Sequence, residues 1–340
     1  MAPVPPVSIL LPFHNAASTL ARALDSLRNQ SFPHWELIAV DDGSSDGSAS
    51  IADIAARQDP RIRVRTQNQG GIVSALNHGL SLAQGPWIAR MDADDESHPE
   101  RLALQVQSLE SDPSLGLVSC RVRYGDDPSV HPGFARHVDW MNQQITHEQL
   151  LLSRFIESPM AHPTVMFRRE LIDRLGGYRE GPFPEDYELW LRWLDAGVRM
   201  AKRPEMLLTW NDPPGRLSRI DPRYAFQAFY QVKSGYLARH LSRILPLNLP
   251  RLAWGAGRLT RRRIEILEAA GVRIDGFIDI DPKKQRIRPD GRAVIAPTAI
   301  PPVGKAFILG CVANWGARDY QRAFLEDRGW REGLDYLFVA

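Results

Sequence analysis

Short apolar runs alternate with segments of helical periodicity along the first third of the chain. The apolar runs, each bounded by turn residues, predict strands at 7–11, 36–40, 61–65, 86–91 and 117–122. Apolar residues that recur every three or four positions predict helices at 19–30, 48–58, 72–83 and 99–110. This alternation predicts an α/β fold whose parallel sheet is covered by helices on both faces.

The pattern then weakens and later restarts, which divides the chain. Residues 124–159 lose the regularity and are predicted to form an inserted, partly helical segment. After them a strand is predicted at 164–167, and helices at 186–196 and 222–241. The proline-rich stretch Leu245–Pro250 is the predicted linker, because a new strand–helix series begins at Leu252. Two domains are therefore expected, at 1–245 and 250–340, and the first has halves at about 5–122 and 123–245.

Composition excludes several classes of protein. The 340 residues are 44% hydrophobic and 24% charged, as in an ordinary soluble globular protein. A net charge of +2 gives no support for a nucleic-acid partner. Cys120 and Cys311 are too few for a disulfide framework or a cysteine-rich zinc site. No apolar run is long enough to span a membrane, and the N-terminus lacks a basic signal region. The expected location is the cytoplasm.

Two acidic clusters follow predicted strands. Asp41 and Asp42 come after the second strand, and Asp92, Asp94 and Asp95 come after the fourth. Ligands of open α/β sheets bind outside the carboxyl ends of the strands. Clustered carboxylates repel one another, and Mg²⁺ or Mn²⁺ with substrate phosphates would compensate that repulsion. The alternative is that these residues cap helices and solvate loops, an explanation that is weaker for two clusters than for one.

Five motifs in register resemble family 2 glycosyltransferases of the GT-A fold. They read VSILLPFHN at 7–15, VDDGSSDGS at 40–48, MDADD at 91–95, AHPTVMFR at 161–168 and PEDYELW at 184–190. The resemblance covers about residues 5–240. It implies a mixed, mainly parallel sheet between helices, with a nucleotide-sugar half followed by an acceptor half.

The resemblance implies a donor site for a nucleotide-diphospho-sugar at the first two motifs. Pro12 and Phe13 would line the nucleotide pocket, and His14 would touch the nucleotide. Asp42 would accept a hydrogen bond from the base ring, a uracil N–H in many members, which makes a UDP-sugar the expected donor. The structural alternative for Asp42 is an aspartate that caps a helix or closes a turn.

Asp92, Ala93 and Asp94 match the Asp-x-Asp motif of the family. Asp94 would bind Mn²⁺ or Mg²⁺, and Asp92 would bind the ribose, or the metal through water. The metal would neutralise charge on the leaving diphosphate. His162 is a further candidate for the metal or the diphosphate, although a lone histidine is more often structural. Asp95 is expected to orient its neighbours or cap the next helix.

Asp186 is the predicted general base. An acceptor hydroxyl is a poor nucleophile, so a positioned carboxylate must take its proton. In the resemblance, this aspartate opens a helix and points at the acceptor, and a helix N-terminus favours the charged form of a carboxylate. Glu185 is the second candidate, either as base or as a contact to the acceptor. The alternative is a helix-capping pair without chemistry.

The C-terminal segment carries a second pattern. Gly255-Ala256-Gly257 follows a predicted strand and opens a helix, a context in which a glycine turn can cradle a phosphate. Asp279 and Asp281 follow at the distance of a ribose-binding acid, but Thr260 replaces the third glycine. The unit resembles the small Rossmann-like N-terminal domain of PglD-type sugar acyltransferases. A structural or partner-docking role is favoured over nucleotide binding here.

The leading hypothesis is an inverting glycosyltransferase that moves a sugar from a nucleotide-diphospho-sugar to a glycan or lipid-linked acceptor hydroxyl. Synthesis of a cell-surface polysaccharide is the expected setting, and a lipid-linked acceptor would bring the protein to the inner membrane face. The hypothesis of a nucleotidyltransferase is weaker, because Leu11–Leu20 has no lysine, arginine or glycine for a loop that binds a triphosphate. An oxidoreductase lacks a suitable catalytic domain. A binding module without turnover would not need Asp92, Asp94 and Asp186 intact.

Overall fold

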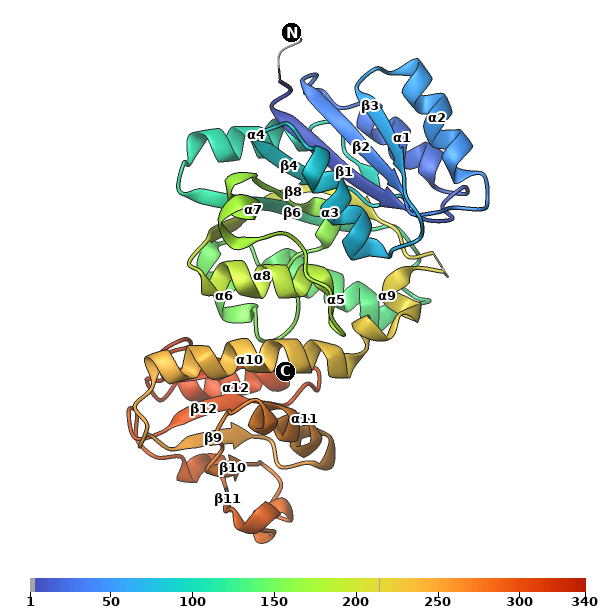
Figure 1. The fold of residues 1–340 in the computed structure, drawn as a ribbon. Helices are drawn as coiled ribbons and strands as arrows, with labels where there is room; N and C mark the ends of the chain where they lie inside the picture. The colour runs from blue at the N-terminus through green and yellow to red at the C-terminus, as the bar shows by residue number, and fades with distance from the viewer. Residues whose placement is uncertain (1–3, 214) are drawn as a thin grey trace. The chain divides into compact units, whose positions relative to one another are not determined.

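The chain divides into two compact units. The computed structural model describes residues 4–213 and 215–340 (Figure 1). The first unit contains residues up to Leu150, Pro159–Gly181 and Glu185–Asp221, and the second contains Leu151–Ser158, Pro182–Pro184 and Pro222–Ala340. The predicted linker at Leu245–Pro250 therefore lies inside the second unit. In the described part of the chain, no helix is long and apolar enough to cross a membrane.

The first unit is built on an eight-stranded sheet in the order β3-β2-β1-β4-β7-β6-β8-β5. Its strands are β1 Val7–Phe13, β2 Trp35–Asp41, β3 Ile62–Thr66, β4 Trp87–Arg90, β5 Glu96–Ser97, β6 Leu115–Tyr124, β7 Met166–Arg168 and β8 Arg199–Trp210. The strands from β3 to β4 run parallel, whereas β7 is antiparallel to both β4 and β6. The sheet is therefore mixed and mainly parallel, which confirms the predicted fold class.

Helices connect these strands. They are α1 Leu20–Arg28, α2 Ser48–Gln58, α3 Ile72–Leu82, α4 Arg101–Ser111, α5 Pro132–Gln143, α7 Glu170–Leu175, α8 Glu185–Asp195 and α9 Leu217–Ile220, with α6 His147–Ser153 extending across the division between the units. The first four agree with the predicted helices to within about two residues at each end, the usual uncertainty of a helix boundary. Two helices, α5 and α6, occupy the segment that was expected to be irregular and partly helical.

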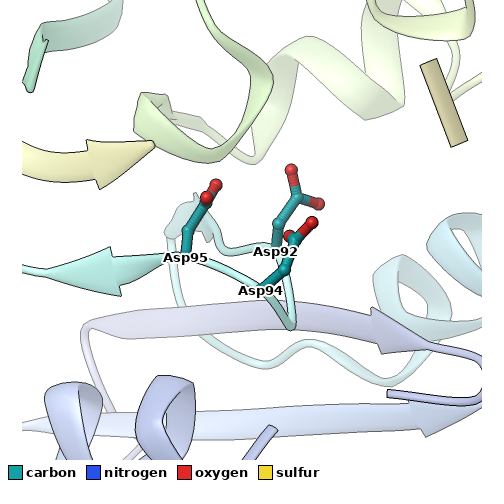
Figure 2. Close-up of side chains that lie close together, drawn as sticks. All are labelled: Asp92, Asp94 and Asp95. Carbon is teal, nitrogen blue, oxygen red and sulfur yellow. The ribbon is translucent and has the colours of Figure 1, made fainter. Parts of the chain in front are cut away.

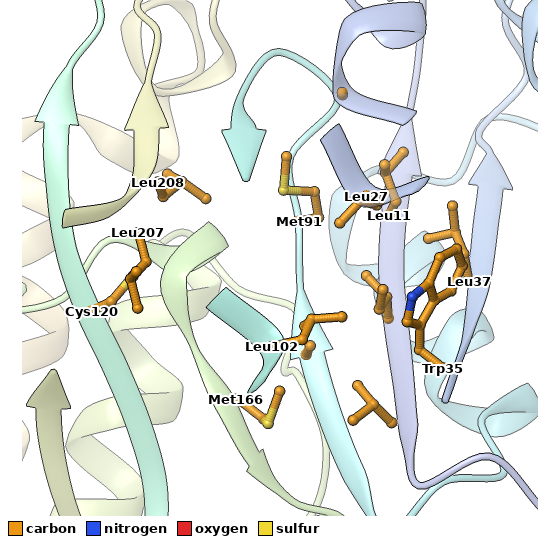
Figure 3. Packing of buried hydrophobic residues seen from close by; sticks show 14 of the residues in the cluster. Leu11, Leu27, Trp35, Leu37, Met91, Leu102, Cys120, Met166, Leu207 and Leu208 are labelled. Carbon is orange, nitrogen blue, oxygen red and sulfur yellow. The ribbon is translucent and has the colours of Figure 1, made fainter. Parts of the chain in front are cut away.

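The core of the first unit lies against the central strands. Leu11, Leu37 and Met91 are fully buried, and Leu102 and Met166 pack into the same cluster (Figure 3). Every residue of β1 and β2 is buried. Parallel strands covered on both faces read as continuous apolar runs. This explains why the sequence pattern identified them without alternation.

The second unit has its own five-stranded, fully parallel sheet in the order β11-β10-β9-β12-β13. Its strands are β9 Arg251–Trp254, β10 Gly276–Ile278, β11 Val294–Ile295, β12 Phe307–Gly310 and β13 Tyr336–Phe338. Its helices are α10 Phe226–Ile244, α11 Arg258–Ala269 and α12 Ala317–Glu326. Helix α10 was predicted to be part of the first domain, but it belongs to this unit.

The glycine turn after β9 is filled by the chain itself. Gly255 has φ +125°, and a Cβ there would lie 2.7 Å from the Val312 side chain, so glycine is required. The Ala256 N–H donates to the Asp279 carboxylate at 2.8 Å, and the Lys284 ammonium lies 3.2 Å from the same group. An internal carboxylate thus occupies the donor that a phosphate would use.

Candidate active site

Three carboxylates meet where β4 ends. Because β1, β2 and β4 run parallel, their carboxyl ends share one edge of the sheet. The loop that leaves β4 carries Asp92, Asp94 and Asp95, and their carboxylate oxygens lie within 4.8 Å of one another (Figure 2). In the described residues, these are the grouped acidic, histidine or cysteine side chains that could hold a metal ion together.

Asp92 is oriented by a buried arginine from the strand itself. The Arg90 guanidinium donates to Asp92 Oδ1 at 2.5 Å and also to the Met91 carbonyl. Arg90 is only 1% exposed, so its charge acts in a region that water screens poorly. Arg90 therefore brings one positive charge into direct contact with a group of three carboxylates, and the cluster retains excess negative charge.

Burial and the excess negative charge raise the pKa of Asp94 and of Asp95. Burial, followed by repulsion from Asp92, raises the pKa of Asp94 to about 6. Burial, followed by Asp94 and Asp92, raises the pKa of Asp95 well above its usual range. Asp95 Oδ1 accepts the Asn211 N–H at 2.9 Å, whereas Oδ2 is buried without a hydrogen-bond partner in the described chain. A buried, unpartnered carboxylate oxygen beside two others fits a hard divalent cation.

The segment after β8 completes this site. Asn211 holds the loop by donating its side-chain N–H to the Asp94 carbonyl at 2.7 Å. The Arg216 guanidinium lies 4.2 Å from the Trp210 ring centre, and its charge lowers the pKa of both Asp94 and Asp95. Sequence reasoning missed both residues, because no motif marks them and only the pairing of β8 with β5 brings them to the cluster.

His162 lies outside the carboxylate cluster, and its predicted role at the metal or the diphosphate stays a prediction. Its Nε2 lies 2.8 Å from the Tyr178 hydroxyl, and its Nδ1 lies 3.7 Å from Glu185 Oε1. Burial lowers the pKa of His162 well below its usual range, so the ring is neutral at neutral pH. Its partners make it a support for the helix that carries Glu185 and Asp186.

Asp186 lies in the first turn of α8. Its carboxylate accepts the Tyr187 N–H at 2.6 Å. Burial and the neighbouring Glu185 raise the pKa of Asp186 to about 8, and Asp92 adds to the increase. The helix N-terminus was expected to keep this carboxylate ionised, but burial and like charge outweigh that effect. The contribution of Asp92 also shows that the two acidic groups interact electrostatically.

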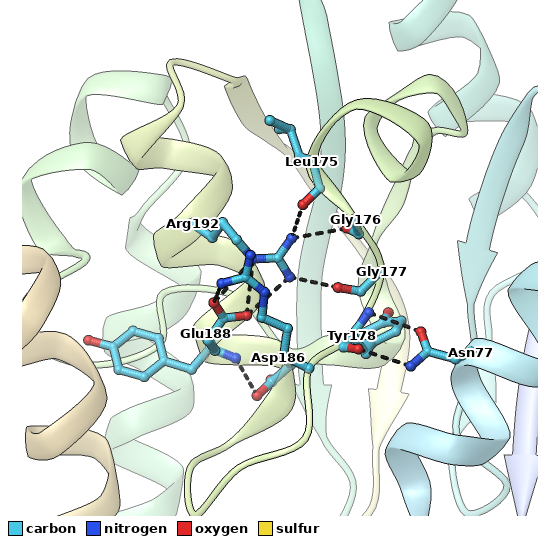
Figure 4. Close-up of polar contacts among 10 residues, drawn as sticks. Asn77, Leu175, Gly176, Gly177, Tyr178, Asp186, Glu188 and Arg192 are labelled. Atoms are coloured by element: carbon cyan, nitrogen blue, oxygen red, sulfur yellow. Dashed lines mark hydrogen bonds and ion pairs between the residues drawn. The ribbon is translucent and has the colours of Figure 1, made fainter.

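Hydrogen bonds connect α8 to α3 through the segment 176–178. Asn77 on α3 and the Tyr178 backbone exchange two hydrogen bonds, at 2.9 and 3.0 Å (Figure 4). Arg192 donates to the Gly176 and Gly177 carbonyls and pairs with Glu188 at 3.1 Å (Figure 4). These contacts give Asn77 a structural role.

Asp42 organises the loop before α3. Its Oδ1 accepts hydrogen bonds from the Gln67 side chain and the Gly70 N–H, and its Oδ2 accepts one from the Gly71 N–H, each at 2.8 Å. The carboxylate therefore has three donors within the chain. Its predicted contact to a nucleotide base would be an additional bond on oxygens that already fix the loop.

The other predicted donor-binding residues have different environments. Phe13 is 4% exposed and belongs to the hydrophobic core, and Pro12 is buried beside it in β1. His14 is exposed, and its Nδ1 lies 3.0 Å from the Asp42 carbonyl. Ala93, at 9% exposure, packs on the core between the two metal-binding candidates. Of the three predicted donor-binding residues in the first motif, Pro12, Phe13 and His14, only His14 is exposed.

The fold matches that of solved GT-A glycosyltransferases. The first 349 residues of S. aureus TarS, solved with UDP-GlcNAc, match with TM-score 0.57 at 19% identity, covering 78% of this chain and 71% of that one. Mannosyltransferase PcManGT from Pyrobaculum calidifontis, solved with GDP-Man and Mn²⁺, matches with TM-score 0.51 at 23% identity, covering 71% and 64%.

Sequence comparison identifies the family. Residues 8–176 match Glycosyl transferase family 2. EpsE of Bacillus subtilis is 34% identical over 208 residues, which are 60% of this chain and 72% of EpsE. The amylovoran biosynthesis glycosyltransferase AmsE of Erwinia amylovora is 29% identical over 204 residues, covering 59% of this chain and 74% of AmsE. The chain belongs to glycosyl transferase family 2, whose relatives here include polysaccharide biosynthesis enzymes.

Proposed function

We propose that the first unit transfers a sugar from a nucleotide-diphospho-sugar to an acceptor hydroxyl, with inversion at the anomeric carbon. One observation carries this proposal. Three carboxylates form a cluster in which one buried oxygen lacks a partner in the described chain, and one of the three, Asp92, helps to raise the pKa of a fourth carboxylate, Asp186. The first set has the chemistry to hold a metal, and the fourth has that of a base.

Asp92, Asp94 and Asp95 would hold Mn²⁺ or Mg²⁺. A divalent cation there would stabilise the negative charge that develops on the leaving diphosphate. Arg90 orients Asp92 through a hydrogen bond, and Arg216 supplies a second positive charge that acts on Asp94 and Asp95. The Mn²⁺ in the PcManGT structure belongs to that protein and supports the same choice of metal for this chain.

Asp186 would remove the proton from the acceptor hydroxyl. Its pKa of about 8 lies close to physiological pH, so Asp186 can be present as the carboxylate before the reaction and still bind the acceptor's proton during it. Glu185 stays the second candidate, but its carboxylate faces His162 at 3.7 Å. No further carboxylate is proposed as a sugar nucleophile, so a single displacement with inversion is the simplest mechanism.

The donor is proposed to be a UDP-sugar. A carboxylate at Asp42 can accept the ring N–H of uracil in addition to its bonds within the loop. The solved relatives hold UDP-GlcNAc in one case and GDP-Man in the other, so the choice of base rests on Asp42. The acceptor is proposed to be a glycan of a cell-surface polysaccharide, free or lipid-linked, in line with the amylovoran role named for AmsE.

A donor panel tests the proposal. Release of nucleoside diphosphate is measured for UDP-, GDP- and TDP-sugars, with Mn²⁺ and with a chelator. UDP-sugars should turn over fastest, and the chelator should abolish turnover. An Asp42→Asn variant should weaken UDP binding by about 1–3 kcal/mol. Retention of the anomeric configuration in any product, read by NMR, would contradict inversion. Binding without turnover for every donor and acceptor would indicate a binding module.

A further inference from the structure

Positive charge is concentrated in the C-terminal third of the chain. Residues 222–340 contain 20 of the 42 lysines and arginines but only 11 of the 40 aspartates and glutamates. This segment has a net charge of +9, and residues 1–221 have −7, so the overall +2 conceals a strong asymmetry. Such an asymmetry between two parts of a chain indicates an anionic partner for the basic part.

The most basic segment is the start of α11. Arg258, Arg261, Arg262 and Arg263 fall within its first six residues, and its first turn has no acidic residue. The N-terminus is the positive end of a helix dipole, so cations placed there destabilise the helix. Within the described residues, Arg258, Arg261 and Arg262 form no ion pair. Folding therefore gives no reason for this arrangement.

Exposed apolar side chains lie among these arginines. Leu259 is 69% exposed directly after Arg258. Across a groove of about 830 Å³ that α10 and α11 line, Phe226 is 52% exposed, and the Arg263 guanidinium lies 4.8 Å from its ring centre. Apolar and cationic groups thus alternate on one surface.

Two more apolar side chains share the sheet edge of Leu259. Strand β9 lies between β10 and β12, and all three run parallel, so the connections that follow them leave from the same edge. Ile280 follows β10 and is 62% exposed, and Trp315 follows β12 and is 75% exposed. Three neighbouring connections each present a large apolar group beside the arginines of α11.

We propose that this α11 surface, defined by Arg258, Leu259, Arg261, Arg262, Ile280 and Trp315, docks on an anionic phospholipid bilayer. Cations gain from the negative surface potential of such a bilayer, and the apolar side chains enter the boundary between headgroups and acyl chains. A nucleic acid would satisfy the arginines but leave the exposed apolar groups in water. The glycine turn after β9 does not recognise the anion, because Asp279 already accepts the Ala256 N–H.

Vesicle flotation of the full chain tests the proposal. The chain should float with vesicles of phosphatidylcholine containing about 30% phosphatidylglycerol, not with pure phosphatidylcholine, and high salt should release it. The Arg258→Gln/Arg261→Gln/Arg262→Gln variant should partition about 100-fold less, at roughly fivefold per charge. Its melting temperature should not fall, because the changes relieve an unfavourable dipole interaction.

A matched control separates this surface from net charge alone. Arg273, Lys305 and Arg331 precede β10, β12 and β13, so they lie at the opposite edge of the same sheet. The triple glutamine variant at these positions loses the same charge and should still float. Equal loss in both variants would overturn the proposal, as would failure of the unmodified chain to float with anionic vesicles.

The apolar contribution is tested by Leu259→Ser/Trp315→Ser, with Leu247→Ser/Leu334→Ser as the control at the other edge. The first pair should weaken flotation and the second should not; equal behaviour would contradict the proposal. A short DNA duplex that binds more tightly than the vesicles would assign the surface to nucleic acid instead. Donor turnover without vesicles should stay unchanged in all variants, so this result and a failure of the proposed transferase activity are distinguishable.

Discussion

The carboxyl-end edges of the two sheets differ in how their acidic residues are satisfied. At the second sheet, Asp279 is 5% exposed, accepts the Ala256 N–H at 2.8 Å and pairs with Lys284. At the first sheet, Asp95 is fully buried, yet one of its oxygens lacks a partner among the described residues, and Asp94 and Asp92 repel it. Both acids follow buried parallel strands, but only the one at the first sheet belongs to a cluster with excess negative charge.

This difference distinguishes Asp279, a carboxylate that stabilises the fold, from Asp95, a carboxylate available for binding or catalysis. A buried carboxylate that is paired and hydrogen-bonded contributes to folding. A buried cluster with raised pKa values costs stability, and such clusters are concentrated at functional sites. The sequence of the glycine turn after β9 suggested a ligand, but the Ala256 N–H of that turn is already bonded to Asp279. The sequence of the Asp-x-Asp segment also suggested a ligand, and beside it one oxygen of Asp95 lacks a hydrogen-bond partner among the described residues.

The largest effect should come from the base. Asp186→Asn keeps the shape of the side chain but removes the proton acceptor, so turnover should fall by about 10²–10⁴. Donor affinity should persist, because Asp186 is on α8 and not in the β4 loop. Asp173→Asn, at an exposed position of α7, is the control and should leave turnover unchanged. Near-normal turnover of Asp186→Asn would transfer the role to Glu185.

A substitution at the carboxyl-end edge of the second sheet should change the stability of the protein but not its donor turnover. Asp279→Ala leaves the Ala256 N–H buried without its acceptor, which should lower the free energy of unfolding by about 1–3 kcal/mol. Donor turnover should not change. The control is Asp327→Ala, which removes an equal charge from an exposed ion pair with Arg328. Loss of donor turnover in the soluble, folded Asp279 variant would show that the two edges do not differ as argued.

The smallest effect is a pH dependence of stability. Asp186 binds a proton up to about pH 8 when folded but only up to about pH 4 when unfolded, so its contribution to stability is present below pH 4 and lost as pH rises to 8. In chelator, the melting temperature of Asp186→Asn should match the unmodified chain near pH 4 and exceed it by several degrees near pH 9. A constant difference across this range would disprove the raised pKa.

Sequence patterns identified the elements whose burial is uniform. Strands β1 and β2 are buried throughout, so they read as apolar runs. Strand β8 was missed, because its twelve residues include Lys202, Arg203, Pro204 and Glu205 and alternate only loosely between buried and exposed. The domain boundary was predicted at the proline-rich stretch where α10 ends. Local composition marks the end of a helix, but it does not reveal which unit the helix packs against, and α10 belongs to the second unit.

Sequence analysis identified the carboxylates of the site but not their surroundings. Asp92 and Asp94 were recognised from spacing within one loop. Asp95 was expected to orient its neighbours or cap the next helix, because the sequence does not reveal that one of its oxygens lacks a partner among the described residues. His162 was assigned to the metal from a motif, whereas its partners Tyr178 and Glu185 depend on tertiary packing. The raised pKa of Asp186 likewise follows from burial, which a helix-end rule does not describe.

The most direct test of the account is calorimetry of Mn²⁺ and donor binding at the β4 loop. The unmodified chain should bind Mn²⁺, and a chelator should abolish its affinity for UDP-sugar. Asp94→Asn should lose both properties, whereas Asp281→Asn, the same change at the edge of the second sheet, should lose neither. Equal affinity of the Asp94 variant and the unmodified chain for Mn²⁺ and for the donor would contradict the central claim that this carboxylate cluster is the metal-dependent donor site.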